Sequence, residues 1–234
     1  MTSKPFNQYG DRFKPTVEGH GVDIASQRQD ELDAASLDYI RATVQAGGRV
    51  TALDLGGGYG THSVRMAKAG AVVTMVDVED MASSAFASAV LDKSVAPDAL
   101  CFIQRNFDHL ADHEIPKDID VLYSQRAIHY VPYRTAETLL RRICNRMARG
   151  GMAYISAAGS DTEYGQTHPD RAKPVEARFN FVTPDMQEAH AIFHKITTYT
   201  EEDMASLLRA VGFKVIQITH SAFGNIKAIA TKPS

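Results

Sequence analysis

The chain has 234 residues, of which 44% are hydrophobic and 23% are charged, with a formal net charge of -3 at pH 7. This composition excludes a disordered chain, and the weakly acidic balance excludes the long-range attraction that a nucleic-acid backbone needs. We therefore expect one globular domain over residues 1–234, with a small molecule as its partner and no nucleic acid.

The two cysteines and the lengths of the apolar runs indicate where the protein is located. The two cysteines, Cys101 and Cys144, stand singly in apolar segments, which predicts two small core residues in a reducing compartment. The N-terminus has no apolar signal-peptide core, and no run of 18 apolar residues occurs. These features predict a cytoplasmic protein without membrane contact.

The sequence predicts an arm, a first helix, and then strands and helices that follow one another up to residue 157. Polar residues rich in glycine and aromatics predict an N-terminal arm over residues 1–25. An amphipathic helix follows, with Ser26 as its cap and with Gly47 and Gly48 at its end. Short apolar strands then alternate with helices, at residues 49–55 (strand), 62–70 (helix), 71–78 (strand), 81–91 (helix), 100–104 (strand), 120–124 (strand), 136–151 (helix) and 152–157 (strand).

Apolar strands without a polar face are typical of a parallel sheet that is covered by helices on both sides. The polar segment 157–198 breaks the alternation and predicts a cap insertion over an opening. A capped helix at 200–213 and two strands, 214–220 and 226–232, then predict an antiparallel hairpin at the sheet edge.

A glycine loop, "LDLGGGYGTHS", carries the strongest functional signal. Gly56, Gly58 and Gly60 follow a buried strand that ends in Asp54, and they permit a tight turn with close backbone approach to a ligand. Seventeen residues beyond Gly60, Asp77 ends the second strand, where a carboxylate can accept hydrogen bonds from both ribose hydroxyls. The spacing predicts a nucleoside-containing ligand.

The spacing of the glycines in the loop distinguishes two classes of nucleoside-containing ligand. A dinucleotide-binding G-x-G-x-x-G places Thr61 or Ser63 where a third small residue is expected, so the match is imperfect. The acid-x-G-x-G-x-G pattern from Asp54 to Gly60 instead resembles the first motif of class I S-adenosylmethionine-dependent methyltransferases. The resemblance covers residues 50–156 and, more loosely, the terminal hairpin.

The resemblance implies a Rossmann-like α/β fold, with a seven-stranded, mostly parallel sheet and an antiparallel last strand. It also implies S-adenosylmethionine as cofactor and S-adenosylhomocysteine as product. Gly56, Gly58 and Gly60 would pass under the methionine part of the cofactor. Asp54 would organise the loop or reach the cofactor's amino group through water, and Asp77 would bind the ribose.

The same resemblance assigns further cofactor contacts. Asn106 stands where the family commonly has an aspartate that accepts from the adenine amine, and Phe107 would lie against the adenine ring; Asp108 takes the polar role if the register shifts by two. Tyr9 and Arg12 belong to an arm that would fold over the cofactor, where Arg12 would meet its carboxylate.

The exit of the strand "DVLYS" should lie beside the sulfonium, because ligands of open parallel sheets bind at the carboxyl ends of the strands. Gln125 would therefore contact the cofactor. His129 has three readings: a general base, a substrate contact or a packed residue. Arg126 would hold a substrate carboxylate or phosphate, or would pair with an acid of the arm.

Further polar side chains are candidates for the acceptor pocket. Tyr130, Tyr164 and His194 stand on segments that can reach it. The histidines show no close metal-binding spacing, apart from His190 and His194 four residues apart, so we expect no metal.

The predicted function is transfer of a methyl group to a small-molecule N, O or C nucleophile by in-line displacement. Three rival hypotheses remain: an RNA or protein methyltransferase, a nicotinamide-dependent oxidoreductase, and a cofactor-binding protein without catalysis. The protein is expected to be a monomer or a homodimer.

Overall fold

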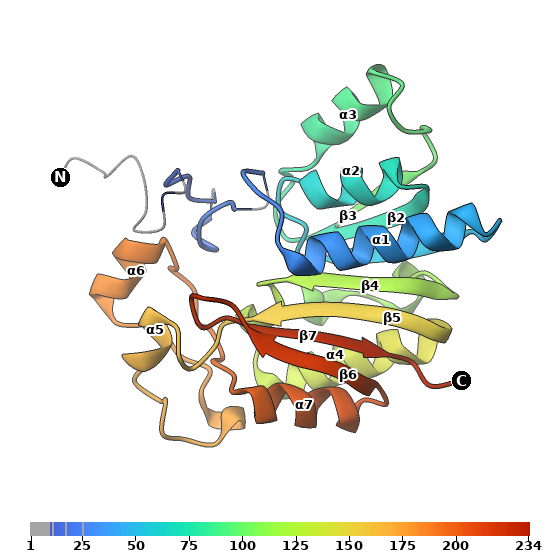
Figure 1. Cartoon of the computed structure of the whole chain (residues 1–234). Helices are drawn as coiled ribbons and strands as arrows, with labels where there is room; N and C mark the ends of the chain where they lie inside the picture. The colour runs from blue at the N-terminus through green and yellow to red at the C-terminus, as the bar shows by residue number, and fades with distance from the viewer. Residues whose placement is uncertain (1–9, 11, 17, 25) are drawn as a thin grey trace.

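One seven-stranded sheet forms the centre of the molecule (Figure 1). The computed structural model describes residues 10, 12–16, 18–24 and 26–234. The strands are β1 (Val50–Leu55), β2 (Ala71–Asp77), β3 (Leu100–Gln104), β4 (Ile119–Gln125), β5 (Met147–Ala157), β6 (Lys214–His220) and β7 (Ile226–Thr231). Their order is β3-β2-β1-β4-β5-β7-β6, and β7 runs antiparallel to both β5 and β6 while the other pairs are parallel. The predicted α/β fold is confirmed.

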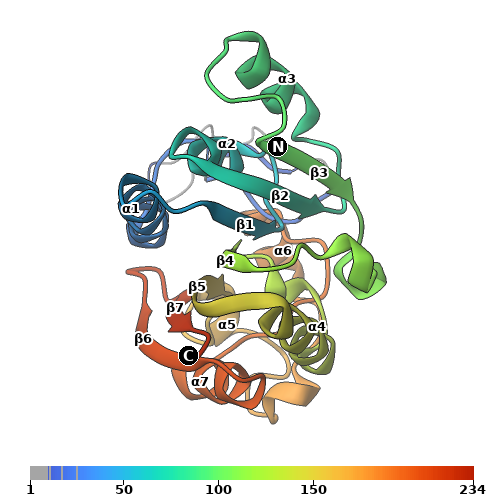
Figure 2. The ribbon, with the colours of Figure 1, turned by 90° about the vertical axis from the view of Figure 1, so that its right-hand side faces the viewer.

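Helices cover both faces of the sheet, as Figure 2 shows from its side. One face carries α1 (Glu31–Gln45), α2 (Thr61–Lys68) and α3 (Ser83–Leu91), and the other carries α4 (Tyr133–Arg146) and α7 (Glu201–Ala210). Because side chains alternate along a strand, Tyr123 of β4 packs in the core with α1 and α2, while Leu122 packs in the core with α4 and α7. Two apolar cores thus hold the strand ends in fixed positions.

The N-cap of the first helix lies four residues beyond the predicted cap. Asp30, not Ser26, is the N-cap of α1: its side chain accepts from the backbone N–H groups of Leu32 and Asp33, and the Asp33 carboxylate accepts from the Asp30 N–H. The Ser26 hydroxyl instead donates to Asp23. The correction follows from this reciprocal capping box, which satisfies more backbone donors than a lone serine does.

The boundary between α4 and β5 also differs from the prediction. The helix begins at Tyr133, directly after Pro132, and ends at Arg146, whereas the sequence predicted residues 136–151. Met147 pairs with Ile119 of β4, so the segment predicted as the last helical turn is the start of β5. Strand pairing has overridden local helix propensity here.

The two cysteines differ in burial. Cys144 of α4 is buried as predicted, but Cys101 is exposed. The reason is that Cys101 lies on β3, the edge strand of the sheet, whose burial is only partial along its length.

A cap lies between β5 and α7, at the same end of the molecule as the arm (Figure 1). It contains the short helices α5 (Glu163–Gln166) and α6 (Pro184–His190). The arm rests on it, because the Gly21 N–H donates to the Ala191 carbonyl over 2.8 Å and the Phe193 N–H to the Gly19 carbonyl over 2.9 Å. The assignment of the whole chain to a single domain stays a prediction.

Candidate functional site

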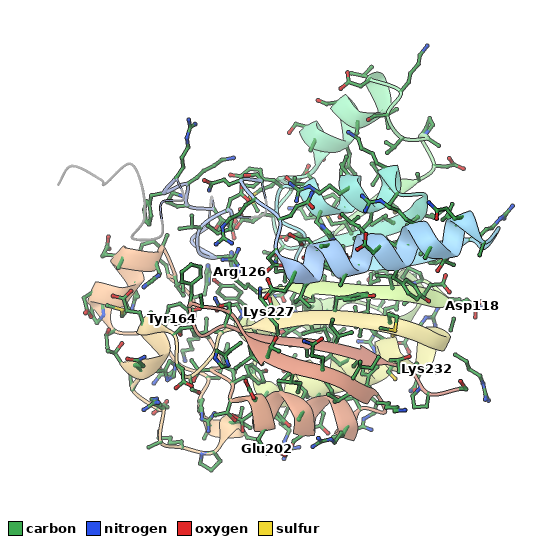
Figure 3. The ribbon with its side chains drawn as sticks, in the orientation of Figure 1. Asp118, Arg126, Tyr164, Glu202, Lys227 and Lys232 are labelled. Carbon is green, nitrogen blue, oxygen red and sulfur yellow. The ribbon has the colours of Figure 1, made fainter. Side chains whose placement is uncertain are left out.

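A cavity of about 950 Å³ opens between the carboxyl ends of β1, β2 and β4, the arm and the cap. Its volume lies at the upper end of the range for small-molecule sites. Figure 3 shows Arg126 and Tyr164 toward this end of the molecule, with Asp118 and Lys232 at the opposite end. The position is that of ligand sites in open α/β sheets.

The glycine loop forms one wall of the cavity. Gly56 has a φ of 73°, and a Cβ added there would lie 2.2 Å from the Ala127 Cβ at the exit of β4. No side chain fits this position, so the backbone itself lines the cavity at Gly56 and Gly58.

Gly60 stands at the end of the loop, where α2 begins, and its predicted contact with the cofactor stays a prediction. It is the N-cap of α2 with a φ of 71°, and an added Cβ would lie 2.6 Å from the Phe86 ring. It is not among the described residues that line the cavity. Gly60 therefore shapes the turn and lets α3 pack closely.

Asp54 is buried under the loop, with 1% of its surface exposed, and also lines the cavity. The Ser63 hydroxyl donates to its Oδ2 over 2.6 Å. Burial raises the pKa of Asp54 to about 7, against the opposing effect of that hydrogen bond. The side chain connects β1 to α2 and so organises the loop.

Asp77 ends β2 and lines the cavity with 8% of its surface exposed. The Gly58 N–H donates to its Oδ2 over 2.8 Å, and the Glu79 N–H donates to its Oδ1 over 3.0 Å. Burial raises its pKa, while these two hydrogen bonds act in the opposite direction. A carboxylate oxygen has two lone pairs, so both oxygens can still accept from a diol.

The exit of β3 supplies the next part of the wall. Asn106 is exposed and lines the cavity, and Phe107 lines it from a buried position. Asp108, the alternative to Asn106, borders a separate shallow hollow with Arg134 and Arg142. Between these two alternatives, the geometry favours Asn106 as the polar group of this wall.

Gln125, at the end of β4, belongs to a buried ionic network. Its Nε2 donates to Asp30 Oδ2 over 2.6 Å, and Lys227 of β7 binds the same carboxylate oxygen at 3.0 Å. With its amide nitrogen held by Asp30, the Gln125 carbonyl oxygen is the group left for a ligand. The network fixes this side chain from two different elements, α1 and β7.

His129 is 2% exposed and lines the cavity. The Ala158 N–H donates to its Nδ1 over 3.3 Å, while Nε2 makes no hydrogen bond to any described residue. Burial, followed by the charges of Arg126 and His20, lowers its pKa to about 3. The ring is neutral, and because Nδ1 accepts a hydrogen bond, Nε2 carries the proton.

Arg126 has a φ of 53°, which is rare for a residue other than glycine. Its N–H donates to both the carbonyl and the hydroxyl of Ser156 on β5, each over 3.0 Å. Its guanidinium lines the cavity, and no described residue forms an ion pair or hydrogen bond with it. The predicted pair with an arm acid is therefore absent among the described residues.

The three remaining acceptor-side candidates all line the cavity. The Tyr130 ring stands edge-on to His20, with 4.9 Å between centroids. His194 stacks on His20 at 3.9 Å, and its Nε2 donates to the Glu18 carbonyl over 2.7 Å. The Tyr164 hydroxyl donates to Asn225 Oδ1 over 3.0 Å. His194 thus holds the arm against the cap.

Of the two arm candidates, Tyr9 and Arg12, the structure describes Arg12 alone. Tyr9 lies outside the described residues. Arg12 is exposed, exchanges backbone hydrogen bonds with the Gln27 side chain and does not line the cavity. Arg28, just before α1, lines it instead.

Four cavity residues were not singled out by the sequence: Arg28, His62, Glu79 and Phe223. Glu79, two residues beyond Asp77, carried a usable signal, because it follows the same strand end. Its Oε1 accepts from the Glu18 N–H over 3.2 Å and lies 3.0 Å from His20 Nδ1. The other three carry no motif of their own.

Two further findings concern the described residues only. They contain no cluster of three or more histidine, cysteine or acidic side chains arranged to hold a metal ion. Among them, no helix is both long and apolar enough to cross a bilayer.

Residues 24–218 match the model of a family described as "Methyltransferase domain". The chain belongs to this family. The match spans more than half of the sequence, so it confirms the family resemblance carried by the glycine loop. It favours methyl transfer over the nicotinamide-dependent rival. A comparison with curated proteins found no match.

Solved structures resemble the fold at low identity. The first is 1,6-didemethyltoxoflavin-N1-methyltransferase from Burkholderia thailandensis with bound S-adenosylhomocysteine, with TM-score 0.60 and 18% identity, over 91% of this chain and 82% of that one. Magnesium protoporphyrin IX methyltransferase from Synechocystis, also with S-adenosylhomocysteine, has TM-score 0.57 and 15% identity over 86% and 82%. The [4+2]-cyclase SpnF has TM-score 0.58 and 14% identity over 86% and 80%. Chains of this fold thus carry more than one named activity.

Proposed function

We propose that this methyltransferase moves the methyl group of S-adenosylmethionine to a small molecule that is enclosed between the arm and the cap. The observation that carries the proposal is a single cavity with two chemically different ends. One end is formed by the glycine loop, Asp77 and Asn106, and the other by the exit of β4 and the cap. Two of the solved structures of similar fold hold S-adenosylhomocysteine, which supports this choice of cofactor.

The residues present fit such a cofactor. A backbone that tolerates no Cβ at Gly56 permits close approach, and the buried Asp77 offers two acceptor oxygens to a ribose diol. Asn106 and Phe107 would take the adenine, and the Gln125 carbonyl oxygen would accept from the amino group. When bound, the cofactor supplies an electrophilic methyl group on a sulfonium.

The chain's own contribution to the reaction is to position the acceptor. A nucleophile must approach the methyl carbon in line with the departing sulfur, and holding it there supplies a large part of the rate. Arg126, His129, Tyr130, Tyr164 and His194 surround the space next to the exit of β4 and would hold the acceptor. The arm and cap close over them through the bonds of Gly19, Gly21 and His194.

The alternatives have less support. An RNA substrate needs a basic rim, whereas Asp185 and Glu188 of α6 stand exposed at the cavity. A chain that binds the cofactor without transferring the methyl group stays the second candidate, because one structure of similar fold is described as a cyclase. The cytoplasmic location and the oligomeric state remain predictions.

Calorimetry tests the cofactor half of the proposal. S-adenosylmethionine and S-adenosylhomocysteine should bind the wild-type chain, and Asp77→Ala should weaken both by about tenfold or more, equivalent to about 1.4 kcal/mol. Asp38→Ala, which removes an exposed carboxylate on α1, is the matched control and should bind as the wild type does. Equal affinity in Asp77→Ala and wild type would sink the assignment.

A further inference from the structure

We propose that the methyl acceptor is an anion, with a carboxylate or phosphate group held between the Arg126 guanidinium and the Nε2–H of His129. This inference rests on the proposed function and adds the chemical class of the acceptor. It depends on two donors that face the cavity without a partner among the described residues.

The first donor is fixed by the backbone. Nδ1 of His129 accepts from the Ala158 N–H, so the ring presents Nε2–H and has no free lone pair toward the cavity. His129 is 2% exposed and lines the cavity, so a hydrogen bond from Nε2 to a ligand oxygen would form in surroundings of low dielectric, where such a bond is stronger than in water.

The second donor is held in a strained backbone. Left-handed φ values cost a non-glycine residue about 1–2 kcal/mol, and the two hydrogen bonds from the Arg126 N–H to Ser156 stabilise this conformation. The consequence is that the guanidinium leaves the sheet at the cavity, next to His129. A guanidinium presents paired N–H groups that match a carboxylate or phosphate.

None of the described carboxylates that line the cavity forms an ion pair with Arg126. The Glu163 carboxylate lies 3.2 Å from His190 Nε2. Asp185 and Glu188 are exposed on α6. An anionic group is therefore the partner that would neutralise Arg126 inside the cavity.

The carboxylate of the cofactor is a second source of the same chemistry. Gln125, Asp30 and Arg28 form the polar wall on the α1 side of β4. Arg126 and His129 lie on the other side, since their backbone and ring bond to Ser156 and Ala158 at the end of β5. The cofactor's amino-acid end fits the first wall, which leaves Arg126 for the acceptor.

The tautomer of His129 also decides whether the ring can take a proton from the nucleophile. The bond that forms joins the acceptor's nucleophilic atom to the methyl carbon, and the bond that breaks joins that carbon to sulfur, which keeps the electron pair. Because His129 presents N–H toward the cavity, a proton on the nucleophile would leave to water and not to this ring.

The test uses chain saturated with S-adenosylhomocysteine and a panel of aromatic fragments in matched triplets of carboxylate, primary amide and amine, with phenyl phosphate added. Ligand-observed NMR and calorimetry report binding. Carboxylates should bind the wild type about tenfold more tightly than their amides, and Arg126→Gln should reduce this preference to about twofold. Arg41→Gln, the same change at an exposed site on α1, should retain the preference.

The outcomes separate the two proposals. Amides or amines that bind the wild type as well as the acids, no binding by any acid, or an acid preference that survives Arg126→Gln would overturn the anionic acceptor. So would a loss of about tenfold in S-adenosylhomocysteine affinity in Arg126→Gln, which would assign the guanidinium to the cofactor. Failure of the wild type to bind S-adenosylhomocysteine at all would instead contradict the proposed function.

Discussion

The Ala158 N–H donates a hydrogen bond to Nδ1 of His129, and this one contact decides what the histidine can offer a ligand. It joins the end of β5 to the turn after β4, the two strands whose exits border the acceptor space. Because the pKa of His129 is about 3, the ring is neutral at physiological pH and acts as a hydrogen-bond donor.

Replacement of His129 should distinguish a role as hydrogen-bond donor from a role as general base. Glutamine places an amide N–H near the position of Nε2, so His129→Gln should retain kcat/KM within about fivefold, whereas His129→Ala should lose about tenfold or more. Steady-state assays of both variants check this. An equally large loss in both, with a pH inflection near 6.5 present only in the wild type, would restore the general-base reading.

Gly56 and Gly58 should differ in their tolerance of alanine. Both have positive φ, but a Cβ at Gly56 would lie 2.2 Å from Ala127, whereas a Cβ at Gly58 has its nearest neighbour 4.0 Å away at Met81. Gly58→Ala should lower the free energy of unfolding by about 1 kcal/mol, and Gly56→Ala by about 3 kcal/mol. Urea unfolding measures both, and equal losses would contradict the close approach of β4 to the loop.

The buried His62 should make the protein sensitive to acid. Burial, assisted by the charge of Arg65, lowers its pKa to about 3, while the unfolded chain titrates near 6.5. Between these values the unfolded state binds a proton that the folded state does not, so the free energy of unfolding falls by about 1.4 kcal/mol per pH unit as the pH drops. Asp54, with its pKa raised to about 7, acts in the opposite direction above pH 3.8.

Comparison with His62→Gln isolates this contribution. Urea unfolding between pH 7.5 and pH 5 should show a smaller loss of stability in the variant, by about 1.4 kcal/mol per pH unit below 6.5. Parallel curves for variant and wild type would show that His62 titrates normally in the folded protein.

The left-handed backbone of Arg126 should lower the stability of the folded protein. Arg126→Gly relieves the left-handed backbone, and the gain of about 1–2 kcal/mol exceeds the entropic cost of glycine, about 0.5–1 kcal/mol. Thermal unfolding should therefore show equal or higher stability together with lost acceptor binding. A variant destabilised by more than about 1 kcal/mol would show that the side chain supports the fold.

Local patterns were sufficient for the sheet and for the part of the cavity wall at the ends of β1 and β2. The glycine loop and Asp77 each follow an apolar strand, and parallel strands bring their ends together, so sequence spacing alone predicted that they share a cavity. The start of α1 was misplaced because Ser26 and Asp30 are both good caps, and only the reciprocal bond with Asp33 decides between them.

The rest of the cavity wall was harder to predict, because it depends on contacts between distant segments. His20 and Glu79 are 59 residues apart, and Gln125 is linked to Asp30 over 95 residues. The tautomer of His129 depends on Ala158, which no periodicity of the sequence indicates. The sequence pointed to Arg12 and not to Arg28, and of these two the packing of the arm places Arg28 at the cavity.

A direct assay of methyl transfer is the strongest test of the proposed function. Purified chain would be incubated with S-adenosylmethionine labelled in its methyl group and with a metabolite extract, and the products would be separated and examined by mass spectrometry. We expect S-adenosylhomocysteine together with label on a small acidic molecule, with the transfer reduced in Asp77→Ala. Cofactor that binds but stays intact with every fraction, or label that appears only on RNA or protein, would contradict it.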